Sequence, residues 1–197
     1  MRHLTLAVFA LGLTQVPLGA APITYVLTGN LDATLNGIGP TDAPFTITLV
    51  GDTGGVSNPL GAHPTVYLNS ITSNTVVWDS QTFSFTDPIV AELDISNGNV
   101  GFTDPNASSY GISICNPAAI QSPYLATSLG PLFDTGCSFG TSAVGTINTT
   151  SGPLALKGAD SVSFQAELQT GVPEPACAGL LATGLLCIGL VRRKSRA

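Results

Sequence analysis

A hydrolytic Ser–His–Asp triad needs a histidine base, and this chain offers one candidate for that role. The chain contains His3 and His63, and His3 lies in a leader that we expect to be removed. A Ser–His–Asp triad would therefore depend on His63 as its base. His63 stands in the loop-like context Gly61-Ala62-His63-Pro64. The pattern favours an exposed loop histidine over a catalytic base.

Carboxylates offer a second route to hydrolysis, because two acids at a suitable separation can cleave a glycosidic bond. Glu92 and Asp94 lie two positions apart and could share one face of a strand. The body contains eleven acids, so chance accounts for any one pair, and two solvated carboxylates are the favoured interpretation. Gly51-Asp52-Thr53-Gly54-Gly55 contains the Asp-Thr-Gly core of aspartic peptidases, and here we expect a turn at a strand end. We therefore predict no catalytic residue.

Cofactor and metal signatures are also weak. Zinc needs three or four grouped ligands, and one histidine with two distant cysteines does not supply them. The sequence contains neither a Walker loop nor the spaced ligands of an EF-hand. Trp78, beside Tyr67 or Phe83, could stack on a sugar ring, but its context Val76-Val77-Trp78 favours a core position. We predict no cofactor and no metal site.

The end of the chain has three blocks of distinct chemistry: the triplet Pro173-Glu174-Pro175, the apolar run Ala176 to Val191, and a basic end with Arg192, Arg193, Lys194 and Arg196. As a helix, the apolar run would span roughly 24 Å, somewhat less than a hydrocarbon core of about 30 Å. The long basic side chains can extend to the interface and cover the difference. The positive-inside rule places the basic end in the cytoplasm. We predict a transmembrane helix over 176–191 and a basic stop over 192–197.

This tail resembles the PEP-CTERM sorting domain of Gram-negative bacteria. The matching blocks are Pro173-Glu174-Pro175, the Leu-, Gly- and Ala-rich stretch 179–186, and Arg192-Arg193-Lys194. The resemblance implies recognition by an exosortase, an anchored intermediate in the inner membrane, and then release or attachment at the cell surface. It also implies association with exopolysaccharide. Stretches 42–48 and 126–131 resemble the uncharacterised bodies of small PEP-CTERM proteins. Since that group has no assigned activity, the resemblance implies an address and adds nothing about the chemistry of the body.

The start of the chain has the pattern of a signal peptide. Arg2 and His3 form a short positive region, Leu4 to Leu13 is apolar, and Gly19-Ala20-Ala21 supplies small residues for signal peptidase. We assign the leader to 1–21, with cleavage after Ala20 or Ala21. Pro22 directly after the cut disfavours the second position. The tail 172–197 and this leader then enclose a body over 22–171.

The body is strongly acidic. It contains one cation, Lys157, and eleven Asp and Glu residues, which gives a formal charge of −10. Phosphate backbones would repel such a surface, so we exclude nucleic acid as a partner. A solvated acidic surface is favoured over dedicated cation capture.

Alternation of apolar and polar residues predicts strands throughout the body. The clearest runs are Leu31–Leu35, Phe45–Leu49, Thr82–Thr86 and Val162–Leu168. Asn97-Gly98 predicts a hairpin, and further breaks occur at Asn36-Gly37, Asn58-Pro59, Asp87-Pro88, Asp104-Pro105 and Asn116-Pro117. About ten short strands predict an all-β fold, an antiparallel β-sandwich of jelly-roll type. We expect 116–137 to be a long loop.

The body cysteines, Cys115 and Cys137, form an even pair in a chain that we expect to be exported. An oxidising compartment favours a disulfide between them. Cys177 and Cys187 lie ten positions apart in the apolar tail, too far to pair along a helix.

Two functional classes remain open. In the first, the chain is an exported, non-catalytic protein of the cell surface or extracellular matrix that associates with exopolysaccharide. In the alternative, it is a secreted glycoside hydrolase that uses carboxylates. The second class requires two acids about 5 to 10 Å apart in one cleft, and that requirement distinguishes the two.

Overall fold

The computed structural model describes residues 20–58, 65–105, 109–116, 125–135 and 142–169. The leader before residue 20, His63, Cys137 and the whole sorting tail lie outside these ranges. No helix occurs in the described part of the chain, which forms ten strands. They are β1 (Pro22–Leu35), β2 (Ala43–Ser57), β3 (Val66–Trp78), β4 (Gln81–Phe83), β5 (Val90–Asp94), β6 (Asn99–Thr103), β7 (Gly111–Cys115), β8 (Leu129–Phe133), β9 (Ser142–Thr149) and β10 (Gly152–Leu168).

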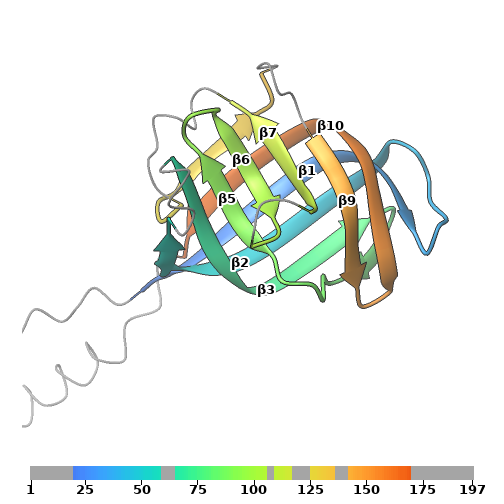
Figure 1. The fold of residues 1–197 in the computed structure, drawn as a ribbon, viewed down its shortest axis with the longest axis horizontal. Coiled ribbons are helices and arrows are strands. Elements are labelled where there is room, and N and C mark those ends of the chain that lie inside the picture. The colour runs from blue at the N-terminus through green and yellow to red at the C-terminus, as the bar shows by residue number, and fades with distance from the viewer. Residues whose placement is uncertain (1–19, 59–64, 106–108, 117–124, 136–141, 170–197) are drawn as a thin grey trace, which may run out of the picture.

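The strands form one antiparallel sheet that closes on itself (Figure 1). The order is β1-β2-β3-β5-β6-β7-β9-β10, and β10 pairs back to β1 from Ile23↔Leu168 to Leu35↔Leu154. Eight strands therefore complete a barrel. Two short strands lie off this path, because β4 pairs only with β3 and β8 pairs with β10.

The prediction of an all-β antiparallel fold is confirmed, but the expected sandwich is wrong. A sandwich has two sheets packed face to face, whereas β1 and β10 here remain paired along nearly their whole length. Irregularities in their register between Thr28 and Asn30, and between Asp32 and Ala33, bend the strands. At Gly29 an added Cβ would lie 2.8 Å from the carbonyl oxygen of Asp160, so a side chain there would block this close approach. Alternating sequence patterns are the same in sandwiches and barrels, and they cannot predict closure.

Inward-facing side chains fill the barrel. An eight-stranded barrel is just wide enough for side chains to occupy its interior. Trp78 is fully buried and its Nε1 donates to the carbonyl oxygen of Leu31 at 3.4 Å, which confirms the predicted core position. The rings of Tyr25 and Phe164 stack with centroids 6.0 Å apart. The largest fully buried side chains are Trp78, Tyr25, Phe102, Phe164, Ile23, Leu27, Leu31, Ile47, Leu49, Leu93, Ile112 and Ile114.

Tight turns lie where Asn-Gly pairs predict them. Asn36 (φ 54°) and Gly37 (φ 81°) both adopt positive φ, and Leu35 and Ile38 exchange backbone hydrogen bonds across them. This geometry suits Asn and Gly, which tolerate left-handed conformations. Asn97-Gly98 lies in the connection from β5 to β6, which confirms the predicted hairpin. The turn between β3 and β4 uses Asp79 and Ser80, also at positive φ, and was not predicted.

The expected loop over 116–137 contains a strand. Within it, β8 pairs with the C-terminal half of β10 at Ser163↔Phe133 and Phe164↔Leu132. The peptide bond Gly130–Pro131 is cis. Gly and Pro weaken any strand signal in the sequence, and pairing with β10 nevertheless makes this segment part of the sheet. The loop prediction is therefore wrong for 129–133.

Both ends of the described chain lie at one edge of the barrel (Figure 1). Ile23 pairs with Leu168, and the backbone N of Gln169 donates to the carbonyl oxygen of Pro22 at 3.0 Å. The segments before and after the body therefore attach side by side. Among the described residues, no helix has the length and apolar character needed to cross a membrane; the segment 176–191 lies outside them.

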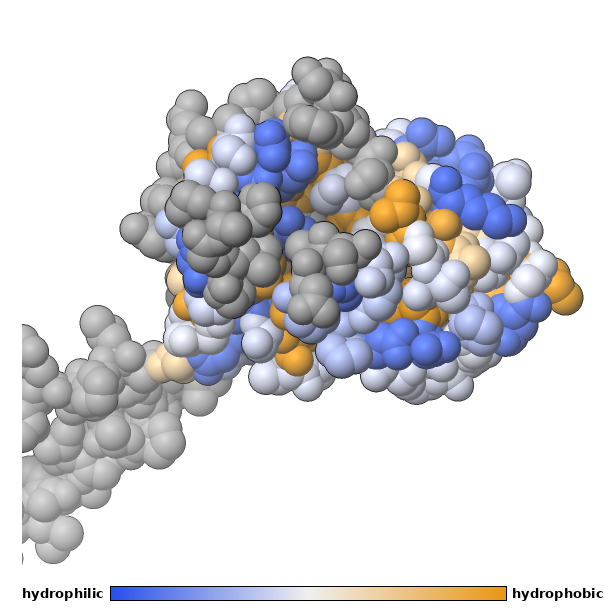
Figure 2. Space-filling view, viewed as in Figure 1, coloured by the Kyte–Doolittle hydropathy of each residue, from blue (hydrophilic) through white to orange (hydrophobic). Residues whose placement is uncertain are grey.

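The visible outer surface is mixed in character. Figure 2 shows hydrophilic and hydrophobic groups interleaved on this face, without one extended hydrophobic patch. The large hydrophobic side chains that are exposed in the described chain are Ile38, Val77, Phe133 and Val144. They come from the β1–β2 connection, β3, β8 and β9, respectively.

Candidate functional site

The carboxylates of β5 point away from the barrel interior. Ala91 and Leu93 are fully buried in the core, and alternation along the strand places Glu92 and Asp94 on the outer face. Glu92 pairs across the sheet with Leu68 on β3 and with Gly101 on β6. The predicted shared strand face of the two acids is confirmed.

Glu92 is partly buried although it faces outward. Val66, Leu68 and Val90 form a small apolar cluster on the same face, each less than a tenth exposed. Burial raises the pKa of Glu92 from its ordinary 4.5 to about 7, and the negative charges of Asp94 and Asp104 add to the shift. A group with this pKa is largely protonated in mildly acidic solution. The prediction of two solvated acids is therefore wrong for Glu92.

Asp94 is held by the turn that follows it. Its Oδ1 accepts hydrogen bonds from the Ser96 backbone N at 2.9 Å, the Ser96 Oγ at 2.6 Å and the Thr65 Oγ1 at 3.3 Å. Its Oδ2 accepts one from the Asn97 Nδ2 at 2.6 Å. Burial alone would raise the pKa of Asp94, but these hydrogen bonds outweigh it and lower the pKa below its ordinary value. The carboxylate braces the β5–β6 hairpin.

The two acids thus favour opposite protonation states, a pattern that can mark an acid and base pair. A base or nucleophile, however, needs a free carboxylate oxygen facing the substrate. Both oxygens of Asp94 are occupied by its own hairpin and by Thr65. The arrangement supports a structural role for Asp94 and leaves Glu92 without a catalytic partner on its strand.

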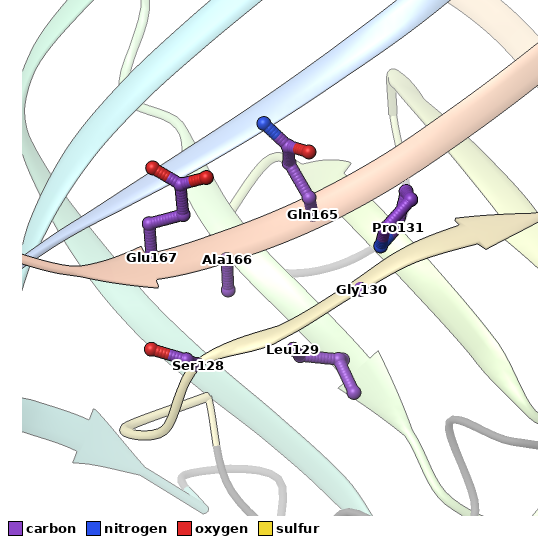
Figure 3. A pocket seen from close by; sticks show the side chains of 7 residues that line it. All are labelled: Ser128, Leu129, Gly130, Pro131, Gln165, Ala166 and Glu167. Atoms are coloured by element: carbon purple, nitrogen blue, oxygen red, sulfur yellow. The ribbon is translucent and has the colours of Figure 1, made fainter.

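Two of the depressions between described elements can be examined for such a pair, and neither contains both Glu92 and Asp94. The first, about 290 Å³, lies between β8 and β10. In Figure 3 the side chains of Gln165 and Glu167 project to one side of β10 and Ala166 to the other. The second, about 400 Å³, lies beside the β1–β2 connection and the β3–β4 turn. Glu167 is the one acid lining the first, and Asp79 is the one acid lining the second, so neither has the two carboxylates that glycoside hydrolysis needs.

The Asp-Thr-Gly segment at 52–54 forms a bulge within β2. The pairing of β2 with β3 jumps between Gly51 and Val56, and the Asp52 Oδ1 accepts from the Gly54 backbone N at 2.7 Å. The expected turn at a strand end is therefore wrong, because β2 continues through these residues to Ser57 and only its pairing with β3 is interrupted.

Sequence reasoning passed over a second such triplet, Asp134-Thr135-Gly136. Asp134 bonds to Val162 of β10, whereas Asp52 lies opposite Pro22 of β1. Pro22 lies at the level of Gln169, and from Gln169 to Val162 the strand rises on the order of 20 Å. The fold therefore keeps the two Asp-Thr-Gly carboxylates apart, and an aspartic dyad does not form within one chain.

A further pattern that sequence reasoning missed is Gly136-Cys137-Ser138-Phe139-Gly140, which has Gly-x-Ser-x-Gly spacing. That motif acts at a strand-to-helix turn. Residues 136–140 lie outside the described residues, so the spacing alone gives it no structural context.

A buried polar pair lies inside the barrel near the edge where the termini emerge. The Asn69 Nδ2 donates to the Tyr25 hydroxyl at 2.6 Å, and that hydroxyl donates to the carbonyl oxygen of Leu125 at 2.5 Å. Burial raises the pKa of Tyr25 to about 12, although the bond from Asn69 opposes the shift. The Asn69 Oδ1 is buried without a partner among the described residues. An Asn at an inward position of an alternating strand is the signal that could have found this pair.

Most of the other predicted site residues lie outside the described part of the chain. Cys115 is buried at the end of β7, while its expected partner Cys137 lies outside the described residues, as does His63. So do the sorting motif Pro173-Glu174-Pro175 and the basic stop at 192–196. Within the described ranges, no three His, Cys, Asp or Glu side chains group as metal ligands.

Comparison with protein-family profiles, with curated proteins and with solved structures gave no match. The family resemblance of the tail therefore rests on its residues alone.

Proposed function

We propose that this chain is an exported, non-catalytic protein of the cell surface or extracellular matrix that an exosortase sorts. One observation carries the proposal: Pro173-Glu174-Pro175, the apolar run 176–191 and the basic end 192–197 follow one another in that order. A signal peptide over 1–21 would start export, and signal peptidase would remove it. The run 176–191 would then hold the chain in the inner membrane until the exosortase acts.

The position of the termini is compatible with this route. β1 begins beside the end of β10, and Thr170-Gly171 are the two residues between the last described residue and the tail. The leader and the tail would thus leave the barrel from one edge. That edge would face the membrane while the rest of the barrel projects away from it.

For the body we propose association with exopolysaccharide. Ile47 and Leu49 are fully buried, which places Thr46 and Thr48 on the outer face of β2. Thr48 pairs with Thr75 of β3, so hydroxyl groups adjoin across neighbouring strands. Hydroxyls can bind sugars, and the acidic body could bridge to acidic polysaccharide through divalent cations.

A pull-down of the secreted protein with the polysaccharide of its own host, with and without calcium, tests this association. We expect retention of the protein, stronger with calcium, and an unchanged polymer length. Shortening of the polymer that disappears in the variant Glu92→Gln would instead establish a carboxylate hydrolase. Absence of retention under both conditions would contradict the proposed association while leaving the sorting route untouched.

A further inference from the structure

We infer that the signal peptide is cut between Ala20 and Ala21, so that Ala21 is the first residue of the mature protein. This inference rests on the proposed export. It decides between two cleavage positions that the small residues Gly19-Ala20-Ala21 leave open.

Ala21 directly precedes β1 and is hydrogen-bonded to β2. Its backbone N donates to the Thr53 Oγ1 at 2.9 Å, and its carbonyl oxygen accepts from the Thr53 backbone N at 3.0 Å. The bulge of β2 at 52–55 brings Thr53 to this position. These two bonds extend the pairing of β1 with β2 by one residue beyond Pro22↔Asp52.

A cut after Ala21 would remove both interactions. Thr53 is partly buried, and it would lose the partners of its backbone N and its hydroxyl together. The new terminus would be Pro22, whose ring nitrogen is a poor substitute for the lost amide. A proline directly after the cut is also unfavourable for signal peptidase. Ala20, by contrast, is exposed, so its departure with the leader uncovers no buried group.

The proposed cut also leaves a terminus that suits its surroundings. Hydrolysis adds water across the Ala20–Ala21 peptide bond: the Ala20 carbonyl carbon gains the oxygen and leaves with the leader as a carboxylate. The Ala21 nitrogen takes up protons and becomes an ammonium group. A charged donor strengthens its hydrogen bond to a hydroxyl, and the body otherwise carries a single cation, Lys157.

The test is the N-terminal sequence of the exported full-length protein, read by mass spectrometry. We expect Ala21-Pro22-Ile23. A mature chain that begins at Pro22 would overturn the inference and leave the proposed export intact. An uncut chain that stays in the cytoplasm would overturn both.

A reciprocal pair of variants gives a second readout that does not depend on folding. The position before the cut must be small, so Ala20→Leu should abolish cleavage and Ala21→Leu should leave it unchanged. Cleavage after Ala21 would produce the opposite result, because Ala21 would then be the residue before the cut.

In the mature protein, Thr53→Val should lower Tm by about 3 °C relative to Thr48→Val. Equal Tm values would contradict the role of Thr53.

Discussion

Ile23 of β1 pairs directly with Leu168 of β10, although 145 positions separate them in the sequence. This contact closes the barrel at the edge where the described chain begins and ends. Closure therefore requires both ends of the body. A chain that lacks the last residues of β10 would leave the first residues of β1 without their second neighbouring strand. The leader and the sorting tail therefore join the body at two positions that the fold brings side by side.

The partly buried Glu92 predicts a pH-dependent stability. Its pKa is raised to about 7 in the folded protein, so the folded state keeps a proton that the unfolded state loses above its ordinary pKa. The contribution of Glu92 is full below about pH 4.5 and is lost as pH rises through 7, by an amount on the order of 3 kcal/mol. Urea unfolding of Glu92→Gln at pH 5 and pH 8 should show a variant that gains stability over wild type as pH rises.

Glu167, exposed on β10, provides the matched control. Glu167→Gln removes the same charge from the outer surface without a buried site. If wild type and Glu92→Gln differ by the same amount at both pH values, the protonation of Glu92 in the folded state is refuted.

The Tyr25–Asn69 pair predicts a measurable loss of stability when the phenol is removed. Tyr25→Phe leaves the Leu125 carbonyl oxygen and the Asn69 Nδ2 without their partner inside the core. The expected cost is about 1–3 kcal/mol in the free energy of unfolding. Tyr110→Phe deletes the same atom where its hydroxyl donates to the Pro88 carbonyl oxygen at the surface, and it should cost less. Equal costs for both variants would show that burial of the Tyr25 bond contributes nothing.

The predicted disulfide between Cys115 and Cys137 gains support from the chain beside it. The Thr135 backbone N donates to the Cys115 carbonyl oxygen at 3.0 Å, so the chain returns to Cys115 two residues before Cys137. Mass spectrometry of the non-reduced exported protein should find the two cross-linked. Closing this loop of about 22 residues should add roughly 3 kcal/mol, so reduction should lower Tm. Two freely alkylated cysteines in that protein would exclude the bond.

The strands were predictable where one face of the strand is buried and the other faces solvent. Val162 to Leu168 and Phe45 to Leu49 alternate strictly, and the structure buries the predicted face of each. Asn97-Gly98 predicted its hairpin because few residue pairs tolerate the backbone of a tight turn. These features depend on a few neighbouring residues, which is why the sequence reveals them.

Closure and the buried site residues were not predictable in the same way. The pairing of β1 with β10 joins the two ends of the body, and no local pattern encodes it. β8 became a strand through its contact with β10 despite Gly130 and Pro131. The raised pKa of Glu92 follows from Val66, Leu68 and Val90 meeting around it from two strands, and spacing within β5 alone could indicate only that Glu92 and Asp94 share a face.

The measurement that tests the central proposal most directly is the fate of Glu174→Ala in the host cell. If an exosortase reads Pro173-Glu174-Pro175, the variant should remain in the membrane fraction with its tail attached, while wild type and the control Glu167→Ala lose the tail. Fractionation followed by mass spectrometry of the C-terminus distinguishes these forms. A Glu174→Ala protein that is secreted with the same C-terminus as wild type would contradict sorting through this motif.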